Sequence, residues 1–180
     1  MPQKSNRSGR SEVTRLDSFI RRLEAQRACL DHAVRLVDDL PGPVLELGLG
    51  NGRTFDHLRS RLPTREIFVF DRQVNAHPAC IPDPAHLFLG EIHVTLDQAR
   101  ARLPAPAALV HSDLGTGDPA GNARLAGWLA RELPPLLAPG AVVVADQPFE
   151  DPRLEPLPLP PGVRDGRYFL YRRLHRRAGW

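Results

Sequence analysis

Runs of consecutive apolar residues recur along the chain, and segments with apolar residues at every third or fourth position lie between them. Short, fully apolar runs are typical of strands that are buried on both faces of a parallel sheet. The pattern therefore predicts a series of strands, the last of which we expect to be antiparallel. These strands span 44–47, 66–70, 87–89, 107–115 with its exit loop included, 141–145 and 168–171.

The intervening segments predict amphipathic helices, because apolar residues recur there with a period near 3.6. The first helix runs from Ser11 or Ser18 to Leu40, and the others span 54–62, about 91–103 and about 123–137. A leading helix, strand–helix repeats and a final strand predict a doubly wound, mostly parallel α/β sheet. Because little chain follows the fifth strand, we expect a reduced C-terminal hairpin in which 154–157 pairs with the last strand.

Length and composition indicate one folded unit. The chain has 180 residues, of which 42% are hydrophobic and 25% charged, as in soluble globular domains. We expect residues 1–10 to be a disordered basic tail and residues 11–180 to form a single domain. The chain has no run of 18 apolar residues and no apolar segment behind a basic start, so we predict a cytoplasmic protein with no membrane contact. Cys29 and Cys80 have no zinc-site spacing, and we predict no metal.

Positive charge is concentrated at the two ends of the chain. Of the net charge of +3, Lys4, Arg7 and Arg10 supply three charges, and the four arginines between 172 and 177 supply four more. The rest of the chain is therefore mildly acidic. Basic ends can contact nucleic acid, but no aromatic residues lie among the N-terminal charges. The support for a nucleic-acid partner is therefore weak.

A glycine-rich turn follows the first predicted strand. Its sequence is Gly48-Leu49-Gly50-Asn51-Gly52, where the chain turns sharply and a ligand can approach the backbone. The dinucleotide-binding fingerprint needs a small third residue where this chain has the bulky Arg53. Glu46 precedes the first glycine by two positions, and Asp71 ends the next strand, 21 residues beyond Gly50.

This combination resembles motif I of the class I S-adenosylmethionine (SAM) dependent methyltransferases. The run LELGLGNGRT and the C-terminal GRYFLYRR also resemble a small bacterial family of short, stand-alone SAM methyltransferases of undefined substrate. The resemblance implies a Rossmann-like class I methyltransferase fold, SAM as cofactor, and Asp71 as the acid that binds the ribose hydroxyls. A carboxylate suits a diol because it accepts two hydrogen bonds. The cofactor-binding residues implied for the first half of the site are Glu46, Leu47, Gly48, Gly50, Gly52 and Asp71.

The resemblance extends to later loops. Arg72, beside the ribose acid, would flank the adenine, and Gly90, Glu91 and Ile92 would contact its amino edge. Asp113 follows the fourth strand, at the edge of an open α/β sheet where ligands bind. It would hold the methionine ammonium of SAM or take a proton from the substrate. His111 is a candidate base because its ordinary pKa lies near neutrality.

The implied reaction is methyl transfer from SAM to an unidentified acceptor. No Asn-Pro-Pro-Tyr type motif for nucleic-acid amino groups follows Leu109-Val110, and no additional domain recognises a polymer. We therefore predict a small-molecule acceptor, with nucleic acid a weaker alternative and a homodimer left open. A non-catalytic SAM-binding module and a nicotinamide-dependent oxidoreductase are the competing functions. Arg53 disfavours the oxidoreductase, as does the lack of a Tyr-x-x-x-Lys pair when Lys4 is the only lysine.

Overall fold

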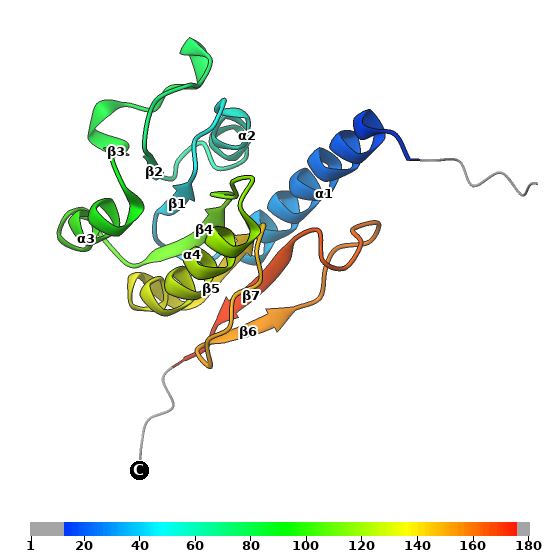
Figure 1. Cartoon of the computed structure of the whole chain (residues 1–180). Coiled ribbons are helices and arrows are strands. Elements are labelled where there is room, and N and C mark those ends of the chain that lie inside the picture. Colours follow the sequence, from blue (N-terminus) through cyan, green and yellow to red (C-terminus); the bar gives the residue numbers. More distant parts are fainter. Residues whose placement is uncertain (1–12, 176–180) are drawn as a thin grey trace, which may run out of the picture.

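The computed structural model describes residues 13–175, and the predicted tail at 1–10 lies outside this range. Its centre is a seven-stranded sheet in the order β3-β2-β1-β4-β5-β7-β6 (Figure 1). The strands are β1 (Val44–Leu47), β2 (Ile67–Asp71), β3 (Leu87–Leu89), β4 (Ala107–Ser112), β5 (Leu137–Ala145), β6 (Leu154–Leu157) and β7 (Phe169–Arg173). The first five run parallel, and β7 pairs antiparallel with both β5 and β6. The predicted doubly wound sheet and its reduced C-terminal hairpin are confirmed.

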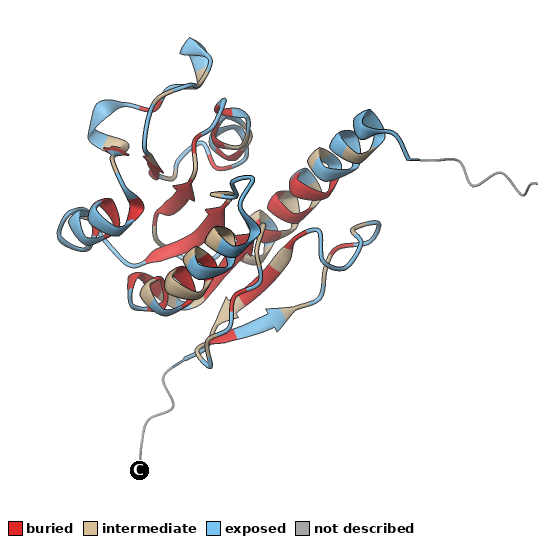
Figure 2. Ribbon diagram, viewed as in Figure 1, coloured by how far each residue is buried: buried red, intermediate tan, exposed pale blue. Residues whose placement is uncertain are grey.

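Helices cover both faces of the sheet. They are α1 (Arg15–Leu36), α2 (Arg53–Arg61), α3 (Ile92–Arg102) and α4 (Pro119–Glu132), with short 3₁₀ turns η1 (Pro78–Cys80), η2 (Pro84–His86) and η3 (Pro134–Leu136). One apolar core joins α3 and α4 to strand residues such as Leu45 and Val110. The other joins α1 and α2 to the alternate residues, such as Val44 and Leu109. The central strands are buried throughout (Figure 2), as expected for a sheet covered on both sides.

Helix boundaries differ from the sequence predictions where local capping decides them. Helix α1 begins at Arg15 because Thr14 and Asp17 form a reciprocal capping box, which satisfies free backbone N–H groups. Helix α4 begins at Pro119, earlier than predicted, because the Asp118 side chain accepts from the backbone N–H of Ala120. It also ends earlier, and the chain passes through η3 into a β5 that is longer than predicted.

Helix α1 packs only along part of its length. Its C-terminal half is buried against the sheet, whereas its N-terminal part extends past the sheet edge (Figures 1 and 2). Leu16, Phe19 and Ile20 on this part are exposed. None of the helices in residues 13–175 has the length and apolarity needed to cross a bilayer.

Candidate active site

A cavity of about 440 Å³ opens where β1, β2 and β4 end. Parallel strands place their carboxyl ends at one edge of the sheet, so the loops after these strands meet there. The volume lies in the range of small-molecule and cofactor sites. The lining residues are Gly48, Gly50, Phe70, Asp71, Arg72, Gly90, Glu91, Ile92, His93, Asp113, Leu114, Gly115, Thr116, Gly121, Arg124 and Leu125.

The glycine turn after β1 brings backbone directly to the cavity wall. Gly48 and Gly50 both have positive φ angles, of 100° and 51°, a conformation that residues with a side chain rarely adopt. A Cβ on Gly48 would lie 2.4 Å from the carbonyl oxygen of Asp113, whereas a Cβ on Gly50 would enter open space. Gly48 therefore allows the loops after β1 and β4 to contact each other, and Gly50 places backbone without a side chain at the cavity wall.

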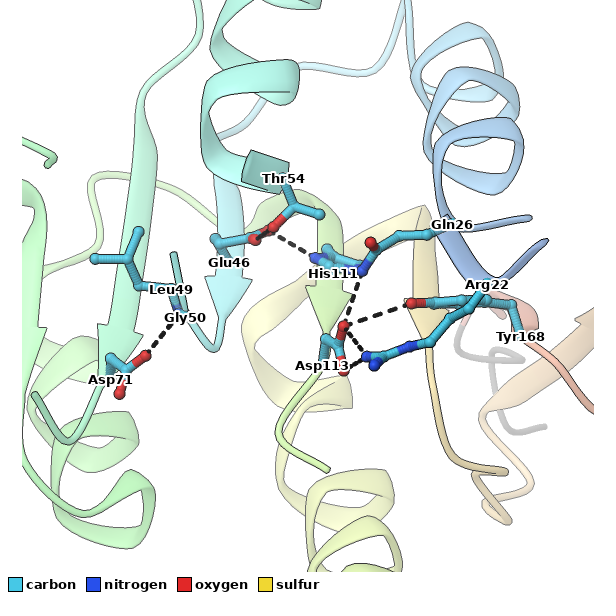
Figure 3. A network of polar contacts seen from close by, with 10 residues as sticks. All are labelled: Arg22, Gln26, Glu46, Leu49, Gly50, Thr54, Asp71, His111, Asp113 and Tyr168. Carbon is cyan, nitrogen blue, oxygen red and sulfur yellow. Dashed lines mark hydrogen bonds and ion pairs between the residues drawn. The ribbon is translucent and has the colours of Figure 1, made fainter. Parts of the chain in front are cut away.

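Asp71 connects the end of β2 to this turn (Figure 3). Its Oδ2 accepts from the backbone N–H groups of Leu49, at 2.8 Å, and Gly50, at 3.0 Å. Its Oδ1 accepts only a long bond, 3.3 Å, from the N–H of Gln73. One carboxylate thus orders the glycine turn and still has an oxygen with capacity for a further donor.

Eight of the predicted site residues line the cavity, and they come from four separate loops. They are Gly48, Gly50, Asp71, Arg72, Gly90, Glu91, Ile92 and Asp113. Within the described part of the chain, Glu46, Leu47, Gly52 and His111 do not line it. Gly52 instead permits close packing, since a Cβ there would lie 2.5 Å from the Cβ of Cys80.

Glu46 is fully buried beneath the cavity, on the face of the sheet that α1 and α2 cover. Its Oε1 accepts a short hydrogen bond from the hydroxyl of Thr54, at the start of α2. Its Oε2 lies 2.8 Å from Nδ1 of His111 on β4. Both carboxylate oxygens are therefore engaged by protein groups, and this acid ties the helix after the glycine turn to the sheet.

His111 links Glu46 to helix α1. Its Nε2 lies 3.4 Å from Nε2 of Gln26, which also donates to Oδ2 of Asp113 at 2.8 Å. With its hydrogen on Nδ1, the ring donates to Glu46 and accepts from Gln26, which satisfies all three groups. Burial by itself would lower the pKa of His111, but Glu46 in the first place, together with the negative charges of Asp113 and Asp146, raises that pKa above its ordinary value.

Asp113 belongs both to the cavity lining and to this buried network. One guanidinium nitrogen of Arg22 lies 2.9 Å from Oδ1 and 2.8 Å from Oδ2 of Asp113. The hydroxyl of Tyr168, just before β7, lies 3.5 Å from Oδ2. Burial and the nearby Asp113 raise the pKa of Tyr168, so the phenol stays protonated and donates.

The sequence prediction missed the partners that organise Asp113. Arg22 and Gln26 lie on α1, and Tyr168 lies at the other end of the chain, so no local spacing connects them to Asp113. A signal was present in α1, where two polar residues interrupt the apolar face at a spacing of four.

Asp146, at the end of β5, lies beside this cluster but is turned toward the loop after β4. A Cβ on Gly115 would lie 2.6 Å from its Oδ2. Burial raises the pKa of Asp146, and the negative charge of Asp113 raises it further. The surroundings of Asp146, close to the cavity, therefore disfavour its charged form.

The family of the chain follows from comparison with known proteins. A family model described as S-adenosyl-L-methionine methyltransferase matches residues 13–173. The chain belongs to this methyltransferase family. A crystal structure of the S-adenosyl-L-methionine methyl transferase from Silicibacter pomeroyi DSS-3 has 48% sequence identity and a TM-score of 0.84. That match covers 89% of this chain and 98% of that one. The family selects a SAM-dependent methyltransferase over the oxidoreductase alternative.

More distant structures share the methyltransferase fold. CalS11, a TDP-rhamnose 3'-O-methyltransferase of calicheamicin biosynthesis, is 21% identical with a TM-score of 0.54, over 89% of this chain and 81% of that one. MycE, of the mycinamycin pathway, is 18% identical with a TM-score of 0.53, over 88% of this chain and 49% of that one. A comparison with functionally curated proteins gave no match.

The cavity of this methyltransferase fits its cofactor in kind and in size. It combines a bare glycine turn with a carboxylate that has an oxygen available, which suits the methionine chain and the ribose diol of SAM. The buried Ile92 and the half-buried Leu125 add apolar side chains to the lining.

Proposed function

We propose that this methyltransferase transfers the methyl group of SAM to a small-molecule acceptor, and that the cavity at the ends of β1, β2 and β4 holds the cofactor. When bound, SAM supplies an electrophilic methyl group on a sulfonium centre. The observation that carries the proposal is the position of Asp71, whose carboxylate orders the glycine turn with one oxygen and keeps the other available. Gly48 and Gly50 would lie along the methionine part.

The adenine end of the cofactor is assigned to the far part of the same cavity. Arg72, Gly90, Glu91 and Ile92 line that part. Ile92 offers an apolar surface for a flat ring, and Glu91 offers a carboxylate for an amino edge. Glu46 and Leu47 then act by fixing β1 and the turn from below, with no direct contact to the cofactor.

Asp113 stands where the cofactor cavity meets the polar cluster of α1. Its oxygens already accept hydrogen bonds from Arg22 and Gln26. We therefore assign it to orienting the reactants and not to taking a proton. His111 is a positioning residue, because it is fully buried and acts on Asp113 through Gln26. Methyl transfer relies strongly on alignment, which can account for much of the rate.

The size of the cavity favours a small-molecule acceptor. The cavity is lined by the loops after β1, β2, β3 and β4 and by α4, and the described residues form one sheet with its covering helices. A cavity of about 440 Å³ suits a small molecule.

Labelled methyl transfer tests the acceptor class. The purified protein is incubated with SAM that carries an isotopic methyl group and with a cell extract separated into small molecules, RNA and protein. We expect label in the small-molecule fraction, and loss of that label with the Asp71→Ala variant. Label that enters only RNA or protein contradicts the proposed acceptor, although the enzyme class would stand.

A further inference from the structure

A second groove lies between α1 and the segment that precedes β7. It has a volume of about 340 Å³. Its lining residues are Arg21, Glu24, Ala25, Arg27, Ala28, Pro161, Gly162, Val163, Arg164 and Arg167. The volume is again in the range of small-ligand sites, but none of these residues belongs to the cofactor cavity.

The lining combines a small apolar floor with a rim of positive charge. Ala25 is buried, and Ala28 and Val163 are half-buried, whereas the four arginines of the groove are exposed. The lining includes one acid, Glu24, for these four guanidinium groups. A concave apolar surface under a charged rim suits an organic molecule with an anionic group.

Some guanidinium groups of the groove are unpaired within residues 13–175. Among residues 13–175, the side chains of Arg27 and Arg164 make no hydrogen bond or ion pair, whereas those of other exposed arginines such as Arg59 and Arg100 do. Arg167 makes only a long contact of 3.5 Å to the hydroxyl of Ser18. Arginine side chains that outnumber the acids beside them and lack an acid partner suit an external carboxylate or phosphate.

Both walls of the groove continue into the cluster around Asp113. On α1, Arg21 lines the groove and the next residue, Arg22, pairs with Asp113. Before β7, Arg167 lines the groove and the next residue, Tyr168, contacts Asp113. Figure 3 shows Arg22 and Tyr168 approaching Asp113 from the same side, opposite the strand that carries Glu46. On each wall, a groove residue is thus the sequence neighbour of a residue that contacts Asp113, which lines the cofactor cavity.

We propose that this groove binds the anionic group, a carboxylate or a phosphate, of the methyl acceptor. The inference rests on the proposed small-molecule acceptor and adds its chemical class. The guanidinium groups of Arg27 and Arg164 hold the anion, the floor formed by Ala25, Ala28 and Val163 contacts the carbon skeleton, and the rest of the molecule extends toward Asp113.

Anion titrations followed by NMR test the site without knowledge of the acceptor. Protein labelled with ¹⁵N and saturated with S-adenosylhomocysteine is titrated with inorganic phosphate and, separately, with benzoate, at constant ionic strength. We expect saturable shifts of the Gly162 and Val163 amide signals with at least one anion, and the stronger of the two identifies the anionic group. Absence of saturable shifts with both anions overturns the proposal.

Variants separate a built site from general charge attraction. The double variant Arg27→Gln/Arg164→Gln should weaken anion binding by about tenfold or more, since hydrogen bonds to charged groups are lost. Arg35→Gln, an exposed arginine on α1 outside the groove, should leave binding unchanged. Equal binding in the double variant would identify an adventitious ion only and would overturn the proposal.

Methyl transfer distinguishes failure of this inference from failure of the proposed function. With the small-molecule fraction as substrate, the double variant should raise KM for the labelled acceptor about tenfold or more, with little change in kcat. An unchanged KM, with the label still in small molecules, would refute the anion-binding role of the groove and leave the proposed function intact. Salt-sensitive RNA binding that the double variant abolishes would replace the small anion by nucleic acid and would overturn both proposals.

Discussion

Glu46 and His111 are register partners on neighbouring parallel strands, and their side chains meet on the same buried face of the sheet. Neither side chain has any solvent exposure, and Oε2 of Glu46 lies 2.8 Å from Nδ1 of His111. A buried acid is costly unless protein groups replace water around it. Here Thr54 and His111 replace that water, so the pair connects the helix after the glycine turn to the strand that presents Asp113.

Removal of one partner of this pair should strongly destabilise the fold. We expect Glu46→Gln to lower the free energy of unfolding by about 3–5 kcal/mol, because the amide has one acceptor oxygen for the two buried donors of Thr54 and His111 and lacks the charge that pairs with His111. Urea unfolding measures the loss. A matched control is Glu66→Gln, which breaks the exposed pair of Glu66 with His86 and should cost less than about 1 kcal/mol. Similar losses for the two variants would contradict a stabilising role for the buried pair.

Titration of His111 should make stability depend on pH. Because its pKa is raised in the folded protein, the stabilisation is complete below the ordinary value of 6.5 and is lost as pH rises through the folded-state pKa. We expect the free energy of unfolding to decrease as pH rises above 6.5, and His111→Asn to remove this slope. A parent protein with constant stability across that range would show that the pKa is not raised.

Protonation of His111 should also change the hydrogen bonding of the Gln26 side chain. A proton on Nε2 of His111 would face the amide nitrogen of Gln26, so the amide must turn and give up its hydrogen bond to Asp113. We expect the Gln26 side-chain amide signals in ¹⁵N NMR spectra to shift with the apparent pKa of His111. Signals that stay fixed while the His111 ring titrates would contradict this coupling.

Asp71→Ala should weaken SAM binding more than it weakens the fold. The substitution removes an acceptor for the ribose hydroxyls and also frees the N–H groups of Leu49 and Gly50. We expect a loss of about 1–3 kcal/mol in SAM binding, measured by calorimetry. Asp97→Ala, which removes an exposed acid of α3, is the control. A folded Asp71→Ala protein that binds SAM as tightly as the parent would refute the ribose assignment.

Asp146→Asn should change how the stability of the protein depends on pH in the acidic range. The pKa of Asp146 is raised by burial and by Asp113. Its contribution to the free energy of unfolding is therefore most favourable below the ordinary pKa of 3.8 and is lost as pH rises through the folded-state pKa. The variant should therefore gain stability relative to the parent as pH increases from 4 to 7. Thermal unfolding at several pH values measures the difference, and a constant difference would contradict the raised pKa.

Much of the fold could be predicted from local sequence. Strands β1 and β3 have the predicted bounds, and 154–157 was expected as a partner of the last strand in a hairpin shorter than that of full class I methyltransferase domains. The predicted helix ends were wrong where a capping hydrogen bond, and not the apolar periodicity, sets the end. Asp118, for example, caps α4 and makes it begin earlier than predicted. Periodicity locates the buried face of a helix well, but the helix ends depend on single hydrogen bonds.

The sequence by itself indicated the family and, through that resemblance, the cofactor and most of the residues that line the cavity, because a glycine turn and strand-end acids are local patterns with fixed spacing. Only the tertiary structure decided what each acid does. Glu46 and Asp71 flank the same turn, yet Glu46 is buried against His111 while Asp71 faces the cavity. The physical reason is that Glu46 lies inside β1 under α1 and α2, whereas Asp71 lies at the end of β2 beside the glycine turn. Partners such as Arg22 and Gln26 for Asp113 come from segments distant in the chain.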